Sequence, residues 1–187
     1  TPYNIFEGSY RLFQTVEYWP EGTTFVSVVD PGVGSKRKSV VALTNKNQYI
    51  VTPDNGTLSF IKKHVGIKAV REISEVANRR ANTEHSYTFH GRDVYAYTGA
   101  KLASGHISFE EVGPELSVEH IVEIPTVETE VGSDFVKGAI DILDVRFGSL
   151  WTSVTREEFY TLLPEFGDRF EVTIYNNDML VYQNQVT

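Results

Sequence analysis

The stretch Val26-Ser27-Val28-Val29-Asp30-Pro31-Gly32-Val33-Gly34-Ser35-Lys36-Arg37 decides the fold, because it joins a strand-like run to a turn that carries polar groups. Residues 25–29 are apolar and mostly β-branched, which predicts a buried strand in the middle of a parallel sheet. Pro31 and Gly32 suit a type II turn. Asp30 is therefore expected at the carboxyl end of a strand, the edge where open α/β sheets bind ligands. The alternative is that Asp30 only caps its own turn.

The composition predicts a globular protein of one or two domains. The chain has 187 residues, of which 41% are hydrophobic and 22% charged. Its formal net charge of -8 argues against a nucleic-acid partner, since only Lys36-Arg37-Lys38 is locally basic. No apolar run is long enough to cross a bilayer, and no secretory signal opens the chain, so we expect a cytoplasmic protein without a membrane partner. The absence of cysteine excludes disulfides and thiolate chemistry.

The first 122 residues mix helical and strand patterns. Asn4 and Glu7 form a helix start, and the run ends at Trp19-Pro20. Residues 39–43 and 49–51 predict a strand pair, and helices are predicted over residues 57–64 and from about 92 to 104, closed by Gly66 and Gly105. We expect an α/β amino-terminal domain over residues 1–122 with a mostly parallel sheet.

From residue 121 onward, alternating apolar residues dominate. Asn176-Asn177-Asp178 predicts a hairpin turn between two strands. The one helical insert covers residues 155–163, where Thr155 and Glu158 match a capping box. We expect residues 123–187 to form a smaller, β-barrel-like carboxyl-terminal domain.

His90 is the histidine best placed for chemistry. It lies just before a predicted helix, where exposed N–H groups favour an anion or polar ligand and disfavour protonation of the imidazole. The alternative is that His90 only caps the helix. The five histidines show no pair at metal-ligand spacing, so no metal site is predicted. Asp54 and Asp93 could pair in space, although a helix-start role is favoured for Asp93.

Four motifs in order resemble one family. They are Asp30-Pro31-Gly32-Val33-Gly34-Ser35 with Arg37, Pro53-Asp54-Asn55-Gly56, Phe89-His90-Gly91-Arg92-Asp93 and Gly113-Pro114-Glu115-Leu116. Together they resemble the S-adenosyl-L-methionine (SAM) hydroxide adenosyltransferases, the hydrolase branch of a superfamily that also contains fluorinating and chlorinating enzymes. The resemblance covers essentially the whole chain.

The resemblance implies a catalytic triad. The family's Asp-Arg-His set, which holds the attacking water, falls on Asp30, Arg37 and His90. Halogenases of the superfamily have a tyrosine where this chain has Asp30, so the aspartate points to water as the nucleophile. The implied reaction converts SAM and water into adenosine and L-methionine.

Three further positions are implied as substrate contacts. Tyr3 lies where relatives place an aromatic ring against the nucleoside, and Asp144 where they hold the methionine part. Ser149 stands where relatives usually have asparagine against adenosine, and Tyr97 replaces a usual proline. The family's amino-terminal Asp-Phe-Gly segment and carboxyl-terminal segment have no counterpart, so we expect both ends of the natural protein to continue.

The chemistry of SAM agrees with this assignment. The sulfonium leaves C5′ as a neutral thioether, so neither a general acid nor a metal or other cofactor is needed. Water is the difficult partner, and Arg37 can stabilise its developing negative charge. Because an arginine beside Asp30 would weaken its affinity for a proton, His90 is the better candidate base, although an orienting role stays open.

The resemblance also implies an assembly. Relatives form homotrimers with each site between the amino-terminal domain of one subunit and the carboxyl-terminal domain of the next, and we expect the same here. Two rival functions remain. One is a SAM-dependent halogenase, which Asp30 argues against, and the other is a non-catalytic adenosine- or SAM-binding module.

Overall fold

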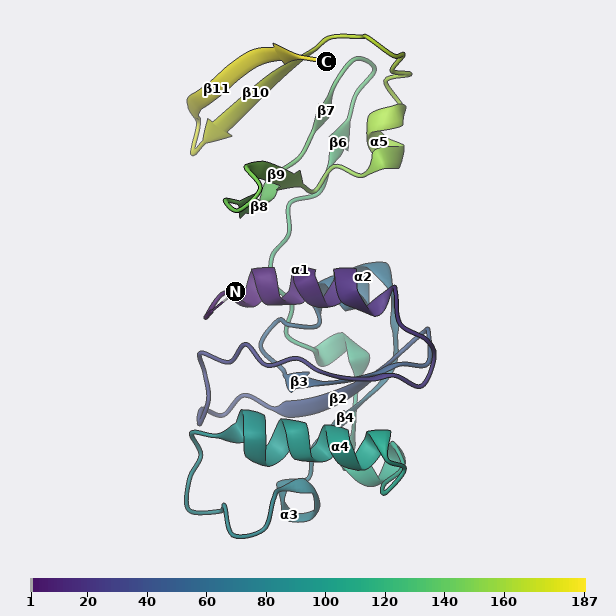
Figure 1. The fold of residues 1–187 in the computed structure, drawn as a ribbon, viewed down its shortest axis with the longest axis vertical. Helices are drawn as coiled ribbons and strands as arrows, with labels where there is room; N and C mark the ends of the chain where they lie inside the picture. Colours follow the sequence, from purple (N-terminus) through teal and green to yellow (C-terminus); the bar gives the residue numbers. More distant parts are fainter. Residues whose placement is uncertain (1) are drawn as a thin grey trace. The chain divides into compact units, whose positions relative to one another are not determined.

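The computed structural model describes residues 2–187. It divides into two compact units, a first unit ending at Pro125 and a second unit, Thr126–Thr187 (Figure 1). Among the described residues, no helix combines the length and the apolar character that a bilayer span needs.

The first unit is built on a five-stranded sheet. Its strands are β1 (Thr24–Val26), β2 (Ser39–Thr44), β3 (Tyr49–Pro53), β4 (Ile67–Glu72) and β5 (Glu115–Leu116), in the order β1-β3-β2-β4-β5. Only the β1–β3 pair is parallel, and the other three pairs are antiparallel. The predicted mostly parallel sheet is therefore wrong. A short turn joins β2 to β3, whereas parallel neighbours need a long crossover.

Strand β1 also lies at an edge of this sheet, and not in its middle. It is three residues long, and the side chain of Val26 is 44% exposed. Beyond the strand, the Ser27 N–H still donates to the Val51 carbonyl at 3.0 Å. The predicted buried strand over residues 25–29 is wrong, because an apolar run alone does not distinguish an edge strand from a central one.

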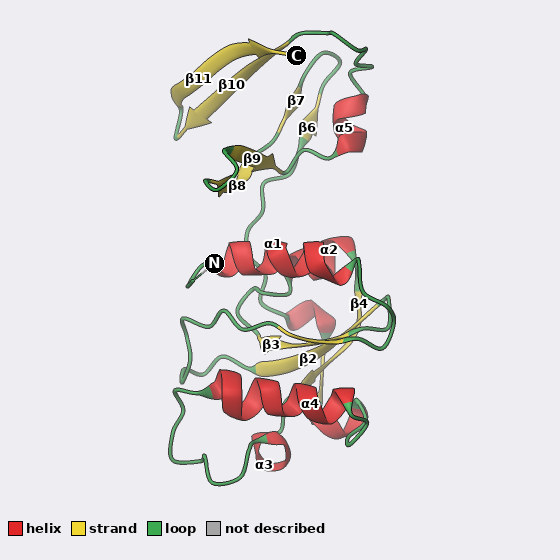
Figure 2. Ribbon diagram, in the orientation of Figure 1, coloured by secondary structure: helices red, strands yellow, loops and turns green. Residues whose placement is uncertain are grey.

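Helices cover both faces of the sheet (Figures 1 and 2). On one face lie α1 (Ile5–Val16) and α2 (Ser59–His64). On the other face, a π-helical segment, η1 (Gly91–Ala96), continues into α4 (Tyr97–Ala103), and the short α3 (Glu75–Asn78) lies near it. Short 3₁₀ turns occur at η2 (Glu110–Val112) and η3 (Val118–His120).

The local helix signals are confirmed. The Asn4 side chain caps α1 by accepting from the Glu7 N–H at 3.1 Å. Gly66 and Gly105 follow α2 and α4 with φ of +82° and +69°, the left-handed conformation that glycine adopts without strain. Each signal acts within a few residues of its own helix end, so the sequence is enough to place it.

Two apolar clusters fill the space between the sheet and its helices. The cluster beneath α1 and α2 comprises Leu12, Val16, Val40, Ala42, Ile50, Leu58, Ile61, Val70 and Ile121. The cluster beneath η1 comprises Val41, Val51, Ile73, Val94, Tyr95, Phe109 and Val112. Successive residues of central strand β2 enter opposite clusters, as side chains of a strand do. Strand β2 therefore supports both helical layers.

The second unit consists of three antiparallel strand pairs and one helix. The pairs are β6 (Glu130–Val131) with β7 (Val136–Lys137), β8 (Ile140–Asp144) with β9 (Ser149–Thr152), and β10 (Phe170–Asn176) with β11 (Met179–Val186). Helix α5 (Arg156–Tyr160) has the predicted capping box between Thr155 and Glu158. The predicted hairpin turn is confirmed by the positive φ of Asn177 and Asp178.

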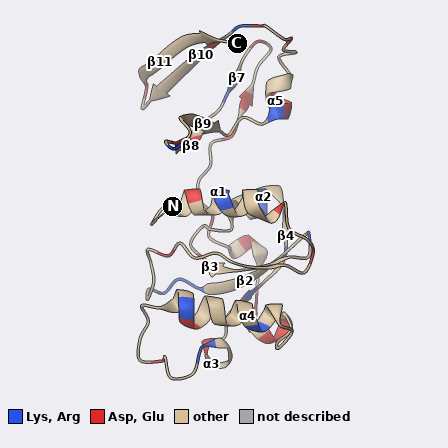
Figure 3. Ribbon diagram, in the orientation of Figure 1, with Lys and Arg blue, Asp and Glu red and all other residues tan. Residues whose placement is uncertain are grey.

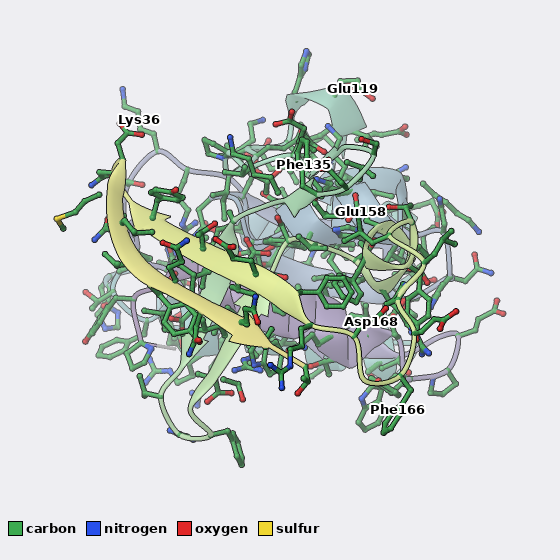
Figure 4. All side chains as sticks on the ribbon, turned by 90° about the horizontal axis from the view of Figure 1, so that it is seen from above. Lys36, Glu119, Phe135, Glu158, Phe166 and Asp168 are labelled. Carbon is green, nitrogen blue, oxygen red and sulfur yellow. The ribbon has the colours of Figure 1, made fainter. Side chains whose placement is uncertain are left out.

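The predicted β-barrel is not formed by the described strands. They make three separate two-stranded sheets and no closed barrel. Side chains along β11 are exposed, and Phe166 in the loop before β10 points outward in Figure 4. Alternation predicts the strands themselves, but it carries no information on which strands pair.

The core of the first unit yields a stability prediction. We expect Val41→Ala to lower the free energy of unfolding by about 2 kcal/mol, because it removes fully buried methyl groups from central strand β2. Val76→Ala makes the same chemical change on a fully exposed side chain of α3 and serves as the control. Urea denaturation followed by circular dichroism measures both, and equal midpoints for the two variants would contradict the assignment of the core.

Candidate active site

The loop from Asp30 to Arg37 links β1 to β2 through two consecutive turns. The Val33 N–H donates to the Asp30 carbonyl at 3.2 Å, and the Ser35 N–H donates to the Gly32 carbonyl at 3.0 Å. Positive φ falls on Gly34, at +80°, and not on Gly32. The turn predicted at Pro31-Gly32 is therefore present, but its predicted type II geometry is wrong. The positive φ that a type II turn requires lies in the second turn, at Gly34.

The side chains at the end of this loop alternate in direction. Lys36 points outward in Figure 4, and Figure 3 shows basic residues along this segment, which enters β2. Arg37 turns inward, and its side chain is only 9% exposed. Neighbouring basic side chains of this run therefore differ in environment, with Lys36 in solvent (Figure 4) and Arg37 in the interior of the first unit.

Arg37 joins Asp30 and His90 in one cluster. Its Nε donates to Asp30 Oδ1 at 2.9 Å and its Nη2 donates to Oδ2, so the ion pair is bidentate. The same Nη2 donates to His90 Nδ1 at 3.0 Å. The Asp30 side chain is 5% exposed, so the pair is shielded from water. The structure thus brings together three residues that are up to 60 positions apart in the sequence.

The two capping alternatives do not describe these side chains. No capping hydrogen bond of the His90 side chain to the helix that follows it is present. The carboxylate of Asp30 bonds to Arg37, seven residues away. Both side chains therefore meet at Arg37.

His90 is a buried, neutral imidazole. Burial is the main cause that lowers the pKa of His90 below its usual 6.5, and Arg37 and Arg79 lower it further against opposing effects of Glu75 and Asp30. Because a guanidinium only donates hydrogen bonds, Nδ1 must accept from Arg37 and the ring proton lies on Nε2. Nε2 is buried without a hydrogen-bond partner among the described residues.

Ser39 and Tyr95 support Arg37 through hydrogen bonds. Its Nη1 donates to Ser39 Oγ at 3.1 Å, and the hydroxyls of Ser39 and Tyr95 share a hydrogen bond of 3.0 Å. Burial, the main cause, raises the pKa of Tyr95 to about 12, so its hydroxyl stays protonated. The Tyr95 ring also lies edge-on to His90, with centroids 6.4 Å apart.

Sequence reasoning missed Ser39 and Tyr95. Ser39 could have been found, because side chains two apart along an extended chain share a face and Arg37 lies two residues before Ser39, the first residue of β2. Tyr95 is five residues after His90, which places the two near each other along one helix, but nothing in the sequence relates its hydroxyl to Ser39.

Two of the three predicted substrate contacts also lie together. Asp144 and Ser149 face each other across β8 and β9, and the Arg146 N–H donates to Asp144 Oδ1 at 3.3 Å. Both belong to the second unit. Tyr3, in the first unit, is exposed with φ of +64°, and no contact of it with the triad residues is described.

The suggested carboxylate pair of Asp54 and Asp93 is not among the described interactions. Asp93 receives two hydrogen bonds from Arg92, at 2.7 and 2.9 Å, and this hydrogen bonding lowers the pKa of Asp93. Asp54 accepts from the Val122 N–H at 2.9 Å. Each carboxylate therefore has a separate partner.

Comparison with known proteins shows the family to which the chain belongs. Residues 1–113 match the SAM hydroxide adenosyltransferase N-terminal domain, which is more than half of the chain. The chain belongs to the SAM hydroxide adenosyltransferase family. Asp30, Arg37 and His90 all lie within the matched residues.

Relatives in this superfamily carry two kinds of name. The (R)-S-adenosyl-L-methionine hydrolase of Methanocaldococcus jannaschii is 36% identical over 84% of this chain and 52% of that protein. The fluorinase of Actinopolyspora mzabensis is 24% identical over 92% of this chain and 64% of that protein. The chain thus spans between half and two thirds of the length of these relatives.

A solved structure shares the fold. An uncharacterized conserved protein from Thermotoga maritima superposes with a TM-score of 0.87 and 31% sequence identity, covering 98% of this chain and 66% of that one. This chain is therefore similar in sequence to the SAM hydroxide adenosyltransferase family. It is similar in structure to the Thermotoga maritima protein.

The environment of His90 predicts its titration. We expect the imidazole of His90 to titrate below its usual pKa of 6.5, which an NMR titration of the histidine ring protons measures. The unfolded chain then binds this proton more readily than the folded one, so the contribution of His90 to stability falls as the pH drops below about 6.5. A titration midpoint above 6.5 would contradict the burial and the neutral state described here.

Proposed function

We propose that this protein hydrolyses SAM to adenosine and L-methionine without a metal or other cofactor. One observation carries the proposal: a buried Arg37 holds Asp30 and His90 in a single hydrogen-bonded cluster at the end of the β1–β2 loop. The (R)-S-adenosyl-L-methionine hydrolases related to this chain support the choice of substrate.

The reaction balances without an external reagent. The water oxygen forms a bond to C5′ of the adenosyl group while the C5′–S bond breaks and its electron pair stays on sulfur. The sulfonium becomes the neutral thioether of methionine, and one proton from the water must be accepted. The protein therefore has to position the water and provide a site for that proton.

Arg37 mainly organises the other two residues. Four of its five N–H groups donate in the described contacts. The Nε–H and one Nη2–H donate to Asp30, the other Nη2–H donates to His90, and one Nη1–H donates to Ser39. The second Nη1–H is left for the attacking water. A positive group at that point stabilises hydroxide-like charge, and a largely buried site strengthens the effect.

The geometry favours Asp30, and not His90, as the proton acceptor. The Nδ1 lone pair of His90 is used by Arg37, and Nε2 carries the ring proton, so this imidazole has no free lone pair. Each carboxylate oxygen of Asp30 accepts one bond from Arg37 and keeps a further lone pair. In this proposal His90 orients the water through its Nε2–H, and Asp30 takes the proton.

The remaining predicted residues bind the rest of the substrate. Tyr3 is proposed to lie against the nucleoside, Asp144 to hold the methionine part, and Ser149 to contact adenosine. Their division between the two units fits a homotrimer in which neighbouring subunits complete each site. We further propose that the protein is cytoplasmic.

Halogen transfer to the same substrate is the second candidate, because a fluorinase is among the relatives. The position of Asp30 opposes it. A carboxylate inside the cluster repels a halide ion, whereas it accepts hydrogen bonds from water. Production of a 5′-halo-adenosine with added fluoride or chloride would favour this candidate.

The first test of the proposed function is product formation. We expect the purified protein to convert SAM to adenosine and methionine without added metal, and Asp30→Asn to lower kcat about 100-fold or more because the proton acceptor is lost. Asp134→Asn, on an exposed carboxylate of the second unit, is the control. Chromatography of the products measures the rates. SAM that binds but stays intact would make the protein a binding module.

The second test concerns the shape of the guanidinium. We expect Arg37→Lys to lower kcat about tenfold to 100-fold, because the three donors of a lysine sit on one nitrogen and cannot replace the four hydrogen bonds that three nitrogens of Arg37 make to Asp30, Ser39 and His90. Lys36→Arg changes the neighbouring exposed side chain and should leave the rate unchanged. Steady-state kinetics with SAM compare the two, and a fully active Arg37→Lys would show that a point charge is sufficient.

A further inference from the structure

One sequence motif takes no part in the proposed chemistry. Pro53-Asp54-Asn55-Gly56 ends β3 and leads toward α2. Its residues touch neither Arg37 nor His90 among the described contacts, yet three of the four are buried and the motif bonds to three separate segments of the first unit.

The first segment is the start of the loop from Asp30 to Arg37, which we call the catalytic loop. Asn55 Nδ2 donates to the Val29 carbonyl at 2.8 Å, immediately before Asp30. The orientation of the Asn55 amide is fixed because its Oδ1 accepts from the Thr57 N–H at 3.3 Å and from Thr57 Oγ1 at 2.7 Å. Asn55 therefore restrains the backbone that carries Asp30.

The second segment is the end of the same loop. The Asp54 N–H donates to the Lys38 carbonyl at 2.9 Å, one residue beyond Arg37. Pro53 lies opposite Ser39 in the β2–β3 register. The motif thus holds the backbone on both sides of the loop that ends in Asp30 and Arg37, and so restrains the distance between these two residues.

The third segment is the end of the first unit. Asp54, which is 7% exposed, accepts the Val122 N–H through Oδ1 at 2.9 Å. Gly56 has φ of +106°, and a Cβ there would lie 2.4 Å from Ile124 Cγ1, so only glycine allows Ile124 to pack so closely. The Ile124 N–H donates to Ser59 Oγ at 2.8 Å, and Ser59 in turn donates to the Gly56 carbonyl.

We propose that the turn Pro53-Asp54-Asn55-Gly56 is a positioning element that fixes the catalytic loop and the connector, residues 122–124, against the same few residues. Asn55 acts on the reacting groups through Val29 and Asp30. Asp54 and Gly56 act on the connector, from which the chain enters the second unit with its proposed substrate contacts. The catalytic part of this inference rests on the proposed function, whereas the anchoring part does not.

The loop arm of the test compares Asn55→Ala with Thr57→Val. The first removes the bond to Val29. The second removes the Thr57 hydroxyl, one of the two donors to Asn55 Oδ1, and keeps the Thr57 N–H donor and the bond of Asn55 to Val29. We expect Asn55→Ala to lower kcat about tenfold with KM changed less than about threefold, because Asp30 loses its restraint. It should also speed amide hydrogen exchange at Val33 and Ser35. Thr57→Val should change neither quantity comparably.

The connector arm compares Asp54→Ala with Asp54→Asn. The alanine variant loses the acceptor for the Val122 N–H, whereas asparagine keeps an oxygen at that place and should restore it. We expect hydrogen exchange at Val122 to speed up about tenfold in Asp54→Ala, with KM for SAM raised more than kcat is lowered. Ser59→Ala gives a second variant for the same segment, read at Ile124, should Asp54→Ala fold poorly.

The two readouts separate the possible failures. If no variant and no wild-type protein hydrolyses SAM, yet exchange at residues 33, 35 and 122 responds as described, the proposed function fails and the anchoring inference stands. If the wild type is active and Asn55→Ala keeps both its kcat and its slow exchange, the positioning inference is overturned. The same holds if Asp54→Ala leaves exchange at Val122 unchanged.

Discussion

The buried ion pair of Arg37 and Asp30 is the interaction on which the first unit's candidate site depends. Their side chains are 9% and 5% exposed, and two such charges are stable inside a protein only when each meets the other with good geometry. The planar guanidinium satisfies this condition by meeting the carboxylate with two nitrogens. It also reaches Ser39 and His90. One side chain therefore fixes the positions of groups from the loop, from β2 and from the start of η1.

Sheet and helix contribute different parts of this arrangement. Strand β2, buried on both sides, provides a rigid base from which Ser39 projects. The segment η1 provides Tyr95 from within and His90 from its beginning, so the two rings are held by one element. π-Helical turns are rare and frequently occur at functional sites. The hydrogen bond between Ser39 and Tyr95 joins the two layers directly behind Arg37.

What the sequence predicted correctly was mainly local. Asn4 as a helix cap, Thr155 with Glu158 as a capping box, and the turn at Asn177 depend on residues a few positions apart. Strand direction and edge position depend on contacts between distant segments, and the sequence predictions of both were wrong. One local prediction was also wrong, because the positive φ expected at Gly32 lies at Gly34.

The candidate site shows the same division. Arg37 and His90 are 53 residues apart, and only the family resemblance suggested that they meet. The position of Ser39 beside Arg37 could have been predicted from the two-residue period of a strand. The contacts of Asn55 with Val29 and of Asp54 with Val122 join segments through backbone groups, which every residue carries, so side-chain identity gives no signal for them.

The alternation at the start of β2 limits how the loop can change in length. Arg37 and Ser39 share a hydrogen bond on one side of the chain, while Lys38 between them meets Glu72 at 2.7 Å on the other. Residues added before Arg37 only lengthen the loop. A single residue added between Arg37 and Ser39 would instead turn the arginine side chain to the opposite face of the extended chain. The guanidinium would then face solvent, although all three triad residues are still present. If this loop is grafted onto another sheet, the strand position that it joins must therefore place Arg37 and Ser39 on the inward face, and this requirement comes before the choice of loop length.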